Sequence, residues 1–304
     1  MTKFYSNGKL LITGEYVVLD GALALAVPTK YGQSLTIEEI ESPKILWTSI
    51  NEKDEIWFEA DFQINSISNS QNSSNNITER LIQILNASKK LNPNFLNSKN
   101  GFKITTNLDF PNNWGLGTSS TLINNIAHWA QIDPYKLLKS TFDGSGYDIA
   151  CAQHNTPITY QIKNHIPIVK EIDFNPSFKN QLYLVHINKK QNSREGIAHY
   201  KANEENSESA INEINAITNK IVSCTQLENF ENLINNHETI ISKITKQTPL
   251  KQLLFDDFKG SIKSLGAWGG DFILATSQTN PTQYFNEKGF HTIIGWNDMI
   301  KKNY

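Results

Sequence analysis

Residues 110–120 have the sequence Phe-Pro-Asn-Asn-Trp-Gly-Leu-Gly-Thr-Ser-Ser, and this junction between a predicted strand and a predicted helix does most to decide the fold. Glycine lets a backbone approach a ligand closely, and a helix start offers free N–H groups and the positive end of the helix dipole. The hydroxyl groups at residues 118–120 can cap the helix, donate to phosphate oxygens or ligate magnesium. The stretch therefore predicts a phosphate-binding loop, with a turn and an ordinary helix cap as the simpler alternative.

Two familiar nucleotide-binding loops are excluded at this junction. The sequence contains no G-x-x-x-x-G-K-[ST] pattern, so it has no Walker P-loop. The third glycine of the dinucleotide-binding fingerprint is missing, and the strands before the junction are predicted to be antiparallel. A phosphate-binding loop here must belong to another class.

Three other stretches combine small residues with charges. In Lys263–Asp271 (Lys-Ser-Leu-Gly-Ala-Trp-Gly-Gly-Asp), small residues before a predicted strand indicate a close backbone approach, or only a hairpin or helix cap. In Gly144–Asp148, the aspartate could be a base, a metal ligand or merely an N-cap. Gly8-Lys9 and Gly14-Glu15 place a lysine near a carboxylate, which is commonly a surface pair and could also be a charge clamp.

Length and composition limit the classes of function. The chain has 304 residues, which favours two compact domains. A net charge of -2 predicts no general attraction to nucleic acid or to an anionic membrane. The two cysteines, Cys151 and Cys224, are too few for a disulfide framework or a thiolate zinc site. The N-terminus lacks the apolar core of a signal peptide, and no run approaches the roughly 20 apolar residues that cross a bilayer. We therefore expect a cytoplasmic protein.

The order of predicted elements indicates an α+β fold. Antiparallel strands are expected first, in β-prone runs separated by glycines and a proline: Leu10–Ile12, Tyr16–Leu19, Ala22–Val27 and Leu35–Ile40. Residues 65–76 are expected to form a solvated loop, followed by a helix that begins near Thr78. The second half predicts two long amphipathic helices, over 211–221 and 230–241, among short strands. We expect two domains, residues 1–165 and 166–304.

Together and in this order, the four stretches resemble the motifs of the GHMP kinase superfamily (galactose, homoserine, mevalonate and phosphomevalonate kinases). Residues 7–16 are similar to its opening motif, and Pro111–Ser120 to its P-x-x-x-G-L-G-S-S phosphate loop. Gly144–Asp148 resembles its G-S-G-x-D segment, and Lys263–Asp271 resembles its closing motif. Residues 146–150, Gly-Tyr-Asp-Ile-Ala, also match the signature of a GYDIA subgroup. The mevalonate and phosphomevalonate branches look most similar.

The resemblance implies a two-domain fold, with an N-terminal domain similar to domain 2 of ribosomal protein S5 and a C-terminal ferredoxin-like sandwich. It implies ATP and Mg²⁺ as cofactors. Asp148 would be the catalytic carboxylate and Lys9 its cationic neighbour. Ser120 would ligate magnesium, and Glu15 is a less certain further ligand. The ATP-binding residues would be Gly115, Leu116, Gly117, Thr118, Ser119, Ser120, Gly266, Ala267, Gly269 and Gly270.

The expected reaction is transfer of the γ-phosphoryl group of ATP to mevalonate or 5-phosphomevalonate, so we expect a small acidic substrate. A phosphate acceptor needs cations more than a base, and Lys189, Lys190 and Arg194 could supply them, with a solvated basic loop as the simpler interpretation. We expect neither nucleic acid nor membrane as a partner, and the family makes a homodimer possible.

Departures from the family's motifs leave other functions open. Asn7 replaces the opening proline, Leu265 a serine and Trp268 a glycine of the closing motif. Residues 134–142 offer no carboxylate for the magnesium-binding glutamate of mevalonate kinases. The Trp268 indole could narrow the acceptor pocket, stack on a ligand or indicate lost catalysis. The alternatives to a kinase are a catalytically silent ATP-binding or regulatory protein and an enzyme similar to diphosphomevalonate decarboxylase.

Overall fold

The structure is a computed structural model that describes residues 1–69, 77–189, 193–202 and 207–302. The chain forms two compact units that alternate along the sequence. Unit 1 comprises Met1–Gly8, Tyr31–Asn112 and Gly117–Gln153, and unit 2 comprises Lys9–Lys30, Asn113–Leu116 and His154–Tyr304. The two units are made of interleaved segments, so they do not test a single domain boundary at residue 165, which stays a prediction.

Unit 1 is built on a sheet in which β4, β3, β5 and β2 are neighbours in that order, and β1 also pairs with β2. β3 is parallel to β5, whereas the β3–β4 and β2–β5 pairs are antiparallel. The strands are β1 (Thr2–Thr13), β2 (Ala24–Ile40), β3 (Lys44–Ile50), β4 (Ile56–Gln63) and β5 (Gly101–Leu108). The helices of this unit are η2 (Ile64–Asn69), α1 (Ile77–Leu91), α2 (Thr118–Ala130), α3 (Pro134–Thr141) and α4 (Tyr147–Gln153).

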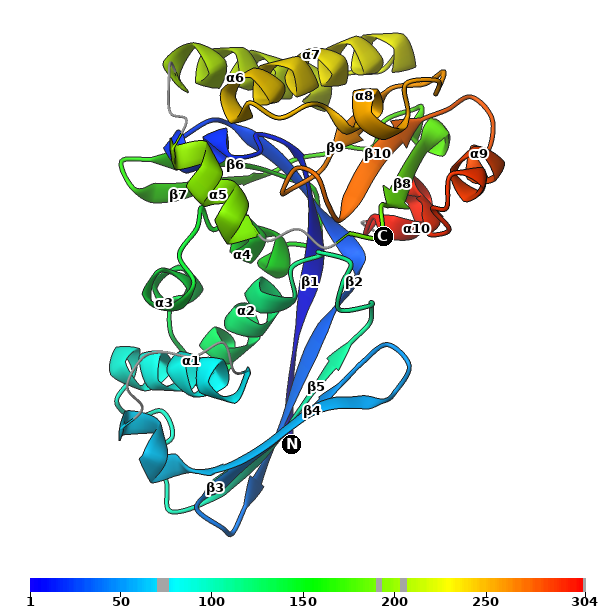
Figure 1. Cartoon of the computed structure of the whole chain (residues 1–304). Helices are drawn as coiled ribbons and strands as arrows, with labels where there is room; N and C mark the ends of the chain where they lie inside the picture. Colours follow the sequence, from blue (N-terminus) through cyan, green and yellow to red (C-terminus); the bar gives the residue numbers. More distant parts are fainter. Residues whose placement is uncertain (70–76, 190–192, 203–206, 303–304) are drawn as a thin grey trace. The chain divides into compact units, whose positions relative to one another are not determined.

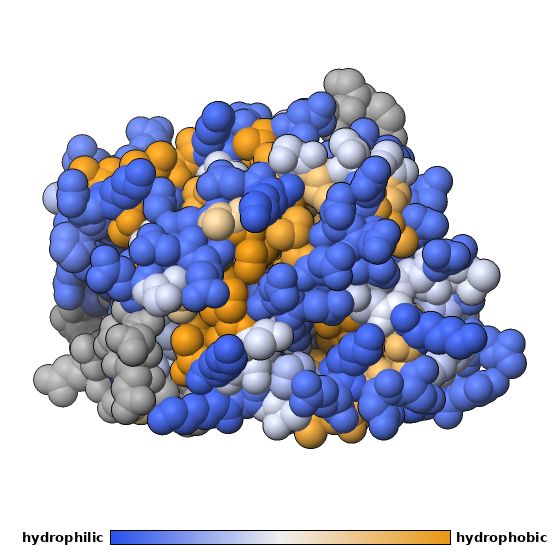
Figure 2. Space-filling view, turned by 90° about the horizontal axis from the view of Figure 1, so that it is seen from above, coloured by the Kyte–Doolittle hydropathy of each residue, from blue (hydrophilic) through white to orange (hydrophobic). Residues whose placement is uncertain are grey.

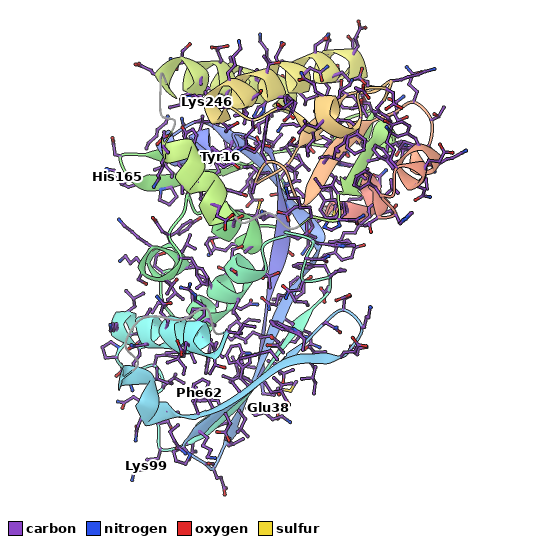
Figure 3. All side chains as sticks on the ribbon, in the orientation of Figure 1. Tyr16, Glu38, Phe62, Lys99, His165 and Lys246 are labelled. Carbon is purple, nitrogen blue, oxygen red and sulfur yellow. The ribbon has the colours of Figure 1, made fainter. Side chains whose placement is uncertain are left out.

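The core of unit 1 lies between its sheet and its helices, with α1 and α2 along one side of the sheet (Figure 1). Both helices occur where the amphipathic pattern predicted them. Apolar residues three and four positions apart share one face of a helix, and that face is buried here. The buried residues include Leu81, Ile84 and Leu85 of α1 and Ile123, Ile126 and Ala127 of α2. Phe62 of β4, labelled in Figure 3, belongs to the same core. Each fully buried side chain of this size stabilises the fold by roughly 1.5–3 kcal/mol.

Unit 2 contains an antiparallel sheet of four strands in the order β11-β8-β10-β9. The first residues of β2 pair with β6, and β6 pairs with β7. The strands are β6 (Ile158–Lys163), β7 (Ile166–Glu171), β8 (Leu182–His186), β9 (Ile262–Ser264), β10 (Phe272–Thr276) and β11 (Ile293–Gly295). The helices are η1 (Val17–Asp20), η3 (Lys179–Gln181), α5 (Ser193–Ala202), α6 (Ser207–Val222), α7 (Leu227–Thr245), α8 (Leu250–Leu254), α9 (Thr282–Glu287) and α10 (Trp296–Met299).

The two long helices predicted in the second half are α6 and α7, which pack side by side (Figure 1). Seen from above in that orientation, the surface is mainly hydrophilic, with hydrophobic residues visible in patches between the polar ones (Figure 2). Among the residues that the structure describes, no helix is long and apolar enough to cross a membrane.

The structure corrects three local predictions. The run Tyr16–Leu19 is not a strand, because a short 3-10 helix follows the left-handed Gly14 and ends at the left-handed Gly21. The two runs predicted on either side of Pro28 form one long strand, β2. It pairs with β6 over residues 24–26 and with β5 over residues 33–40, so the missing N–H of Pro28 interrupts neither ladder.

The third correction concerns the loop expected at residues 65–76. Residues up to Asn69 belong to η2, and Ile67 is fully buried in the core of unit 1. The remaining residues, 70–76, lie outside the described residues.

Candidate functional site

In unit 2, Lys9 of β1 contacts the segment that carries the first half of the predicted phosphate loop. Its backbone N–H donates to the Leu116 carbonyl at 3.0 Å, and its Nζ donates to the Gly115 carbonyl at 3.3 Å. The structure therefore brings together the predicted cation and two of the predicted ATP-binding residues.

Gly115 of the predicted phosphate loop lies against Asp271 of the closing motif. Its φ is +66°, and a Cβ at this position would lie 2.2 Å from Cγ of Asp271. Asp271 is in turn held by the residues that follow β8: its N–H donates to the Lys189 carbonyl at 2.7 Å, and its carbonyl accepts from Ile187 N–H at 2.9 Å. Only glycine can occupy position 115 without displacing this carboxylate.

A small depression lies where these segments meet in unit 2. Gly266 and Gly269 of the closing motif have φ values of +65° and +89°, and open space surrounds the place where each would carry a Cβ. Glycine at these two positions is required by backbone conformation, and it leaves bare backbone facing open space. The depression is lined by Lys9, Leu10, Leu11, Trp114, Gly115, Leu265, Gly266, Asp271 and Phe272.

In unit 1, the second half of the predicted phosphate loop forms the start of α2. Gly117 is the N-cap, with φ +97° and no side-chain cap hydrogen bond. A glycine cap leaves the first N–H groups of the helix without a capping side chain, so they remain suited to binding an anion. Thr118 is half-buried and Ser119 is exposed, whereas the Ser120 hydroxyl donates to the Gly117 carbonyl at 2.9 Å.

A network of buried amides fixes α2 within unit 1. The Asn125 side chain donates to the Gln33 carbonyl at 2.9 Å and accepts from the Ser6 hydroxyl at 2.7 Å. Asn124 donates to Ser6 at 2.9 Å and accepts from Gln153 at 3.0 Å. These bonds connect α2 to β1, β2 and the end of α4, and being fully satisfied they make the position of the helix specific.

Asp148 lies in the first turn of α4, directly after the predicted G-S-G-x-D turn. Gly144 and Gly146 are both left-handed, with φ values of +120° and +87°. The Gly146 carbonyl accepts from Ala150 N–H at 3.1 Å, which starts the helix. Asp148 is half-buried, and α4 packs against α2. Its carboxylate thus belongs to the same unit as the start of α2.

Unit 2 also contains a buried charge cluster that the sequence did not predict. Lys263 of β9 is fully buried and donates from Nζ to Oε1 of Glu15 at 2.5 Å and to the Ser264 carbonyl at 2.9 Å. Oε1 of Glu238 lies 3.6 Å from the same Nζ. His237 Nε2 accepts from Gly14 N–H at 3.0 Å and lies 3.2 Å from Oε2 of Glu15. One cation thus faces two carboxylates in a region without solvent.

Burial shifts the titration of three members of this cluster. It raises the pKa of Glu15, against the opposing attraction of Lys263, and raises the pKa of Glu238 to about 7. Burial, with the nearby Lys263 as the second cause, lowers the pKa of His237 well below its ordinary value. His237 is therefore neutral at neutral pH.

Glu15 was expected to be a less certain magnesium ligand, and that role stays a prediction. The structure gives its fully buried carboxylate a lysine partner, which favours a structural role. A sequence signal for the other members existed in α7. His237 and Glu238 follow Phe230 and Ile234 at helical spacing, so two ionisable residues fall on the buried face of an amphipathic helix.

The raised pKa of Glu238 makes a testable statement about stability. The folded protein retains a proton on Glu238 between pH 4.5 and about 7, where the unfolded chain loses it. The contribution of this group is therefore fully present below pH 4.5 and is lost as the pH rises to about 7. We expect Glu238→Gln to gain stability relative to the natural protein over this interval, by about 2–3 kcal/mol.

The measurement is the free energy of unfolding from urea titrations at pH 5, 6, 7 and 8. Lys263, Glu15 and Ser264 act on position 238 in both proteins, so the difference in stability between the two proteins isolates the carboxyl at 238. Glu228→Gln is the control, because Glu228 is exposed on the same helix. A difference that stays constant with pH would show that Glu238 titrates normally.

The sequence allowed the Trp268 indole to narrow the acceptor pocket or to stack on a ligand. In the structure the side chain is buried instead. The indole is 1% exposed and packs in a core of unit 2 with Tyr16, Val17, Ile214 and Ile241. Its backbone N–H donates to the hydroxyl of Tyr16 at 3.1 Å, and Tyr16, labelled in Figure 3, stacks on Tyr200 of α5. Trp268 is therefore a core residue in this structure, and its tentative role towards a substrate stays a prediction.

The structure describes only some of the other predicted substrate residues. Lys189 is exposed, and its carbonyl accepts from Asp271 as described above. Arg194 lies in α5, and Lys190 lies outside the described residues. Their roles, like those of Asp148 and Ser120, stay predictions. In the described part of the chain, no group of three His, Cys, Asp or Glu side chains could hold a metal ion.

Solved structures with the same architecture cover almost the whole chain. A Methanococcus jannaschii mevalonate kinase has a TM-score of 0.71 at 18% identity, covering 99% of this chain and 98% of that one. A Streptococcus pneumoniae phosphomevalonate kinase, solved with phosphomevalonate and AMPPNP, has a TM-score of 0.70 at 17% identity, covering 98% and 97%. A Lactococcus lactis galactokinase, solved with galactose, has a TM-score of 0.71 at 12% identity, covering 98% and 92%. The chain has the GHMP kinase fold.

The two-domain α+β fold expected from the four motifs is thereby confirmed. No protein-family model matches the sequence, and no curated protein matches it significantly. At these identities the likeness concerns the fold, and the motifs and the geometry above have to carry any statement about chemistry.

Gly115 provides a test of the predicted phosphate loop. Gly115→Ala places a Cβ in the space of the Asp271 carboxylate, in a left-handed conformation that itself costs roughly 1–2 kcal/mol. We expect the variant to fold and to bind ATP at least about tenfold more weakly, a change of ~1.4 kcal/mol. Isothermal titration with a non-hydrolysable ATP analogue measures this.

The matched control is Gly289→Ala, since Gly289 has φ +86° with no atom near the added Cβ. It reproduces the conformational cost without the collision. Equal affinities in the two variants would show that the collision with Asp271 is not what shapes the loop.

Proposed function

We propose that this chain is an ATP-dependent kinase that transfers the γ-phosphoryl group to a small acidic acceptor of the mevalonate pathway, either mevalonate or 5-phosphomevalonate. The observation that carries the proposal is the geometry around Gly115. A left-handed glycine lies against Asp271 and under Lys9, and a second left-handed glycine, Gly117, then opens α2 without a capping side chain. Backbone of this kind is suited to phosphate groups.

ATP fits the bare glycines of both segments. In unit 1, the N–H groups at the start of α2 are suited to phosphate oxygens. In unit 2, Gly266 and Gly269 leave the backbone of the closing motif open to a ligand. Lys9 would supply the positive charge that phosphoryl transfer requires. These assignments use residues of each unit separately and follow the motif order of the sequence.

Magnesium also fits the residues present. Mg²⁺ keeps several waters and is commonly bound by one or two protein oxygens together with substrate phosphates, so a cluster of carboxylates is not required. Ser120 is the residue that would hold it, because its hydroxyl lies in the first turn of α2. The ion would neutralise charge on the transferred group.

The chemistry of the acceptor decides how much Asp148 contributes. The hydroxyl group of mevalonate must lose a proton during transfer, and Asp148 would accept it. The phosphate of 5-phosphomevalonate is already an anion, so it would need cations such as Lys189, Lys190 and Arg194 more than a base. The composition of the chain favours a cytoplasmic enzyme, and a homodimer is compatible with the proposal.

The test is a coupled assay of ADP release with Mg-ATP, offering mevalonate and 5-phosphomevalonate separately. Turnover with one of them identifies the acceptor. Binding of ATP without turnover would favour the silent nucleotide-binding alternative, and release of carbon dioxide from diphosphomevalonate would identify a decarboxylase. If the protein neither bound ATP nor turned over either acceptor, the proposal would be refuted.

A further inference from the structure

The buried charge cluster of unit 2 joins the ends of the segments that carry the first and last motifs. Glu15 follows the end of β1, six residues after Lys9. Lys263 and Ser264 end β9, and residues 265–271 follow directly as the loop that lines the depression. His237 and Glu238 belong to α7, which contacts β9. The cluster is therefore placed to control the loop.

Core stability alone does not explain why a lysine occupies this position. Burying an ion pair costs desolvation energy, and an apolar core of similar volume is often as stable. What the ammonium group adds is a set of directional hydrogen bonds. Lys263 Nζ bonds the Glu15 carboxylate and the Ser264 carbonyl, and it faces Glu238, so it holds the start of the loop at a defined place.

Other contacts hold the loop further along: Trp268 is buried in a core, and Asp271 forms backbone hydrogen bonds with Ile187 and Lys189. The cluster acts at the start of the loop. Gly266 and Gly269 have no side chains that could anchor the loop, and open space lies where a Cβ would be. Leu265 N–H donates to the Phe272 carbonyl at 3.1 Å, and Trp268 N–H donates to Tyr16. Glu15 and Tyr16 are adjacent, so the Glu15–Lys263 and Tyr16–Trp268 contacts form two successive links between the same two segments.

We infer that Lys263 is the positioning residue of a hydrogen-bonded cluster that holds the 265–271 loop against Gly115 in a geometry that receives phosphate. In this cluster Lys263 bonds Glu15 and the Ser264 carbonyl, and the Ser264 hydroxyl bonds Glu238. The kinetic part of this inference rests on the proposed function, whereas the order of the loop does not.

Ser264→Ala tests the inference without removing a charge. The variant deletes the hydroxyl that donates to Oε2 of Glu238 at 3.1 Å. Ser261→Ala is the matched control, since Ser261 is equally buried and accepts from Asn235 of the same helix at 2.9 Å. Hydrogen exchange of the 265–271 amides, measured without substrate, should accelerate about tenfold in Ser264→Ala and stay unchanged in Ser261→Ala.

Kinetics separates positioning from general stability. Ser264→Ala should raise the KM for ATP by about three- to tenfold with kcat nearly unchanged, because the loop binds phosphate and does not take part in proton transfer. Unchanged exchange in Ser264→Ala, or equal acceleration in the control, would overturn the inference. If the natural protein turned over neither acceptor, the exchange experiment would still decide it.

A charge-neutral pair of substitutions gives a second, independent test. Lys263→Met leaves Glu15 buried and unpaired, so Tm should fall by about 10 °C, while Lys263→Met with Glu15→Gln should recover most of it. The double variant should nevertheless keep the raised KM and the rapid exchange of the loop. Recovery of all three together would mean that the cluster only stabilises the fold.

Discussion

Asp148→Asn is expected to lower kcat with mevalonate by about 10²–10⁴-fold, the contribution typical of a positioned general base. The amide has nearly the same size as the carboxylate, so α4 should keep its packing on α2 and the Tm should stay close to that of the natural protein. The loss should appear in kcat and in kcat/KM equally, because proton abstraction occurs only in the transition state. Steady-state ADP release with each acceptor measures it.

The control for this variant is Asp143→Asn, in the same turn. Asp143 is exposed with φ +61°, a conformation that asparagine also tolerates. It should keep full activity. With 5-phosphomevalonate as the acceptor, the Asp148→Asn defect should be milder, because the attacking oxygen is already ionised. Full activity of Asp148→Asn on mevalonate would remove the base from the proposed mechanism.

The features that could be predicted from the sequence are those that short stretches determine. The apolar stripes of α1, α2 and α7 follow from spacing alone. The left-handed residues Gly115, Gly117 and Gly146 follow from motifs in which glycine has a conformational reason. Local signals therefore predict these helices and place glycines in the loops of the candidate site.

The features that could not be predicted depend on partners distant in the sequence. Glu15 and Lys263 are 248 positions apart, and no local sequence pattern predicts the hydrogen bond between them. Tyr16–Leu19 has strand propensity, yet the turn around it and burial of Val17 and Val18 override that propensity. The direction of the Trp268 side chain is likewise decided by the core into which it packs, not by its neighbours in the loop.

Trp268→Gly, which restores the glycine of the family motif, is expected to destabilise the protein rather than to activate it. The indole is 1% exposed and fills a core beneath α6 and α7, so its removal leaves a cavity among Tyr16, Ile214 and Ile241. Removing a buried tryptophan costs about 3–5 kcal/mol. Thermal unfolding should show a Tm lower by about 10 °C, and ADP release should not exceed that of the natural protein.

Trp268→Phe separates packing from backbone freedom. The φ of Trp268 lies outside the left-handed region, so glycine is not needed there, whereas Gly266 and Gly269 do need it. Nε1 of the indole has no hydrogen-bond partner among the described residues, so phenylalanine loses volume but no bond. It should cost less than about half of the Trp268→Gly effect. A Trp268→Gly protein with unchanged Tm and higher kcat would instead mean that the indole covers the phosphate loop.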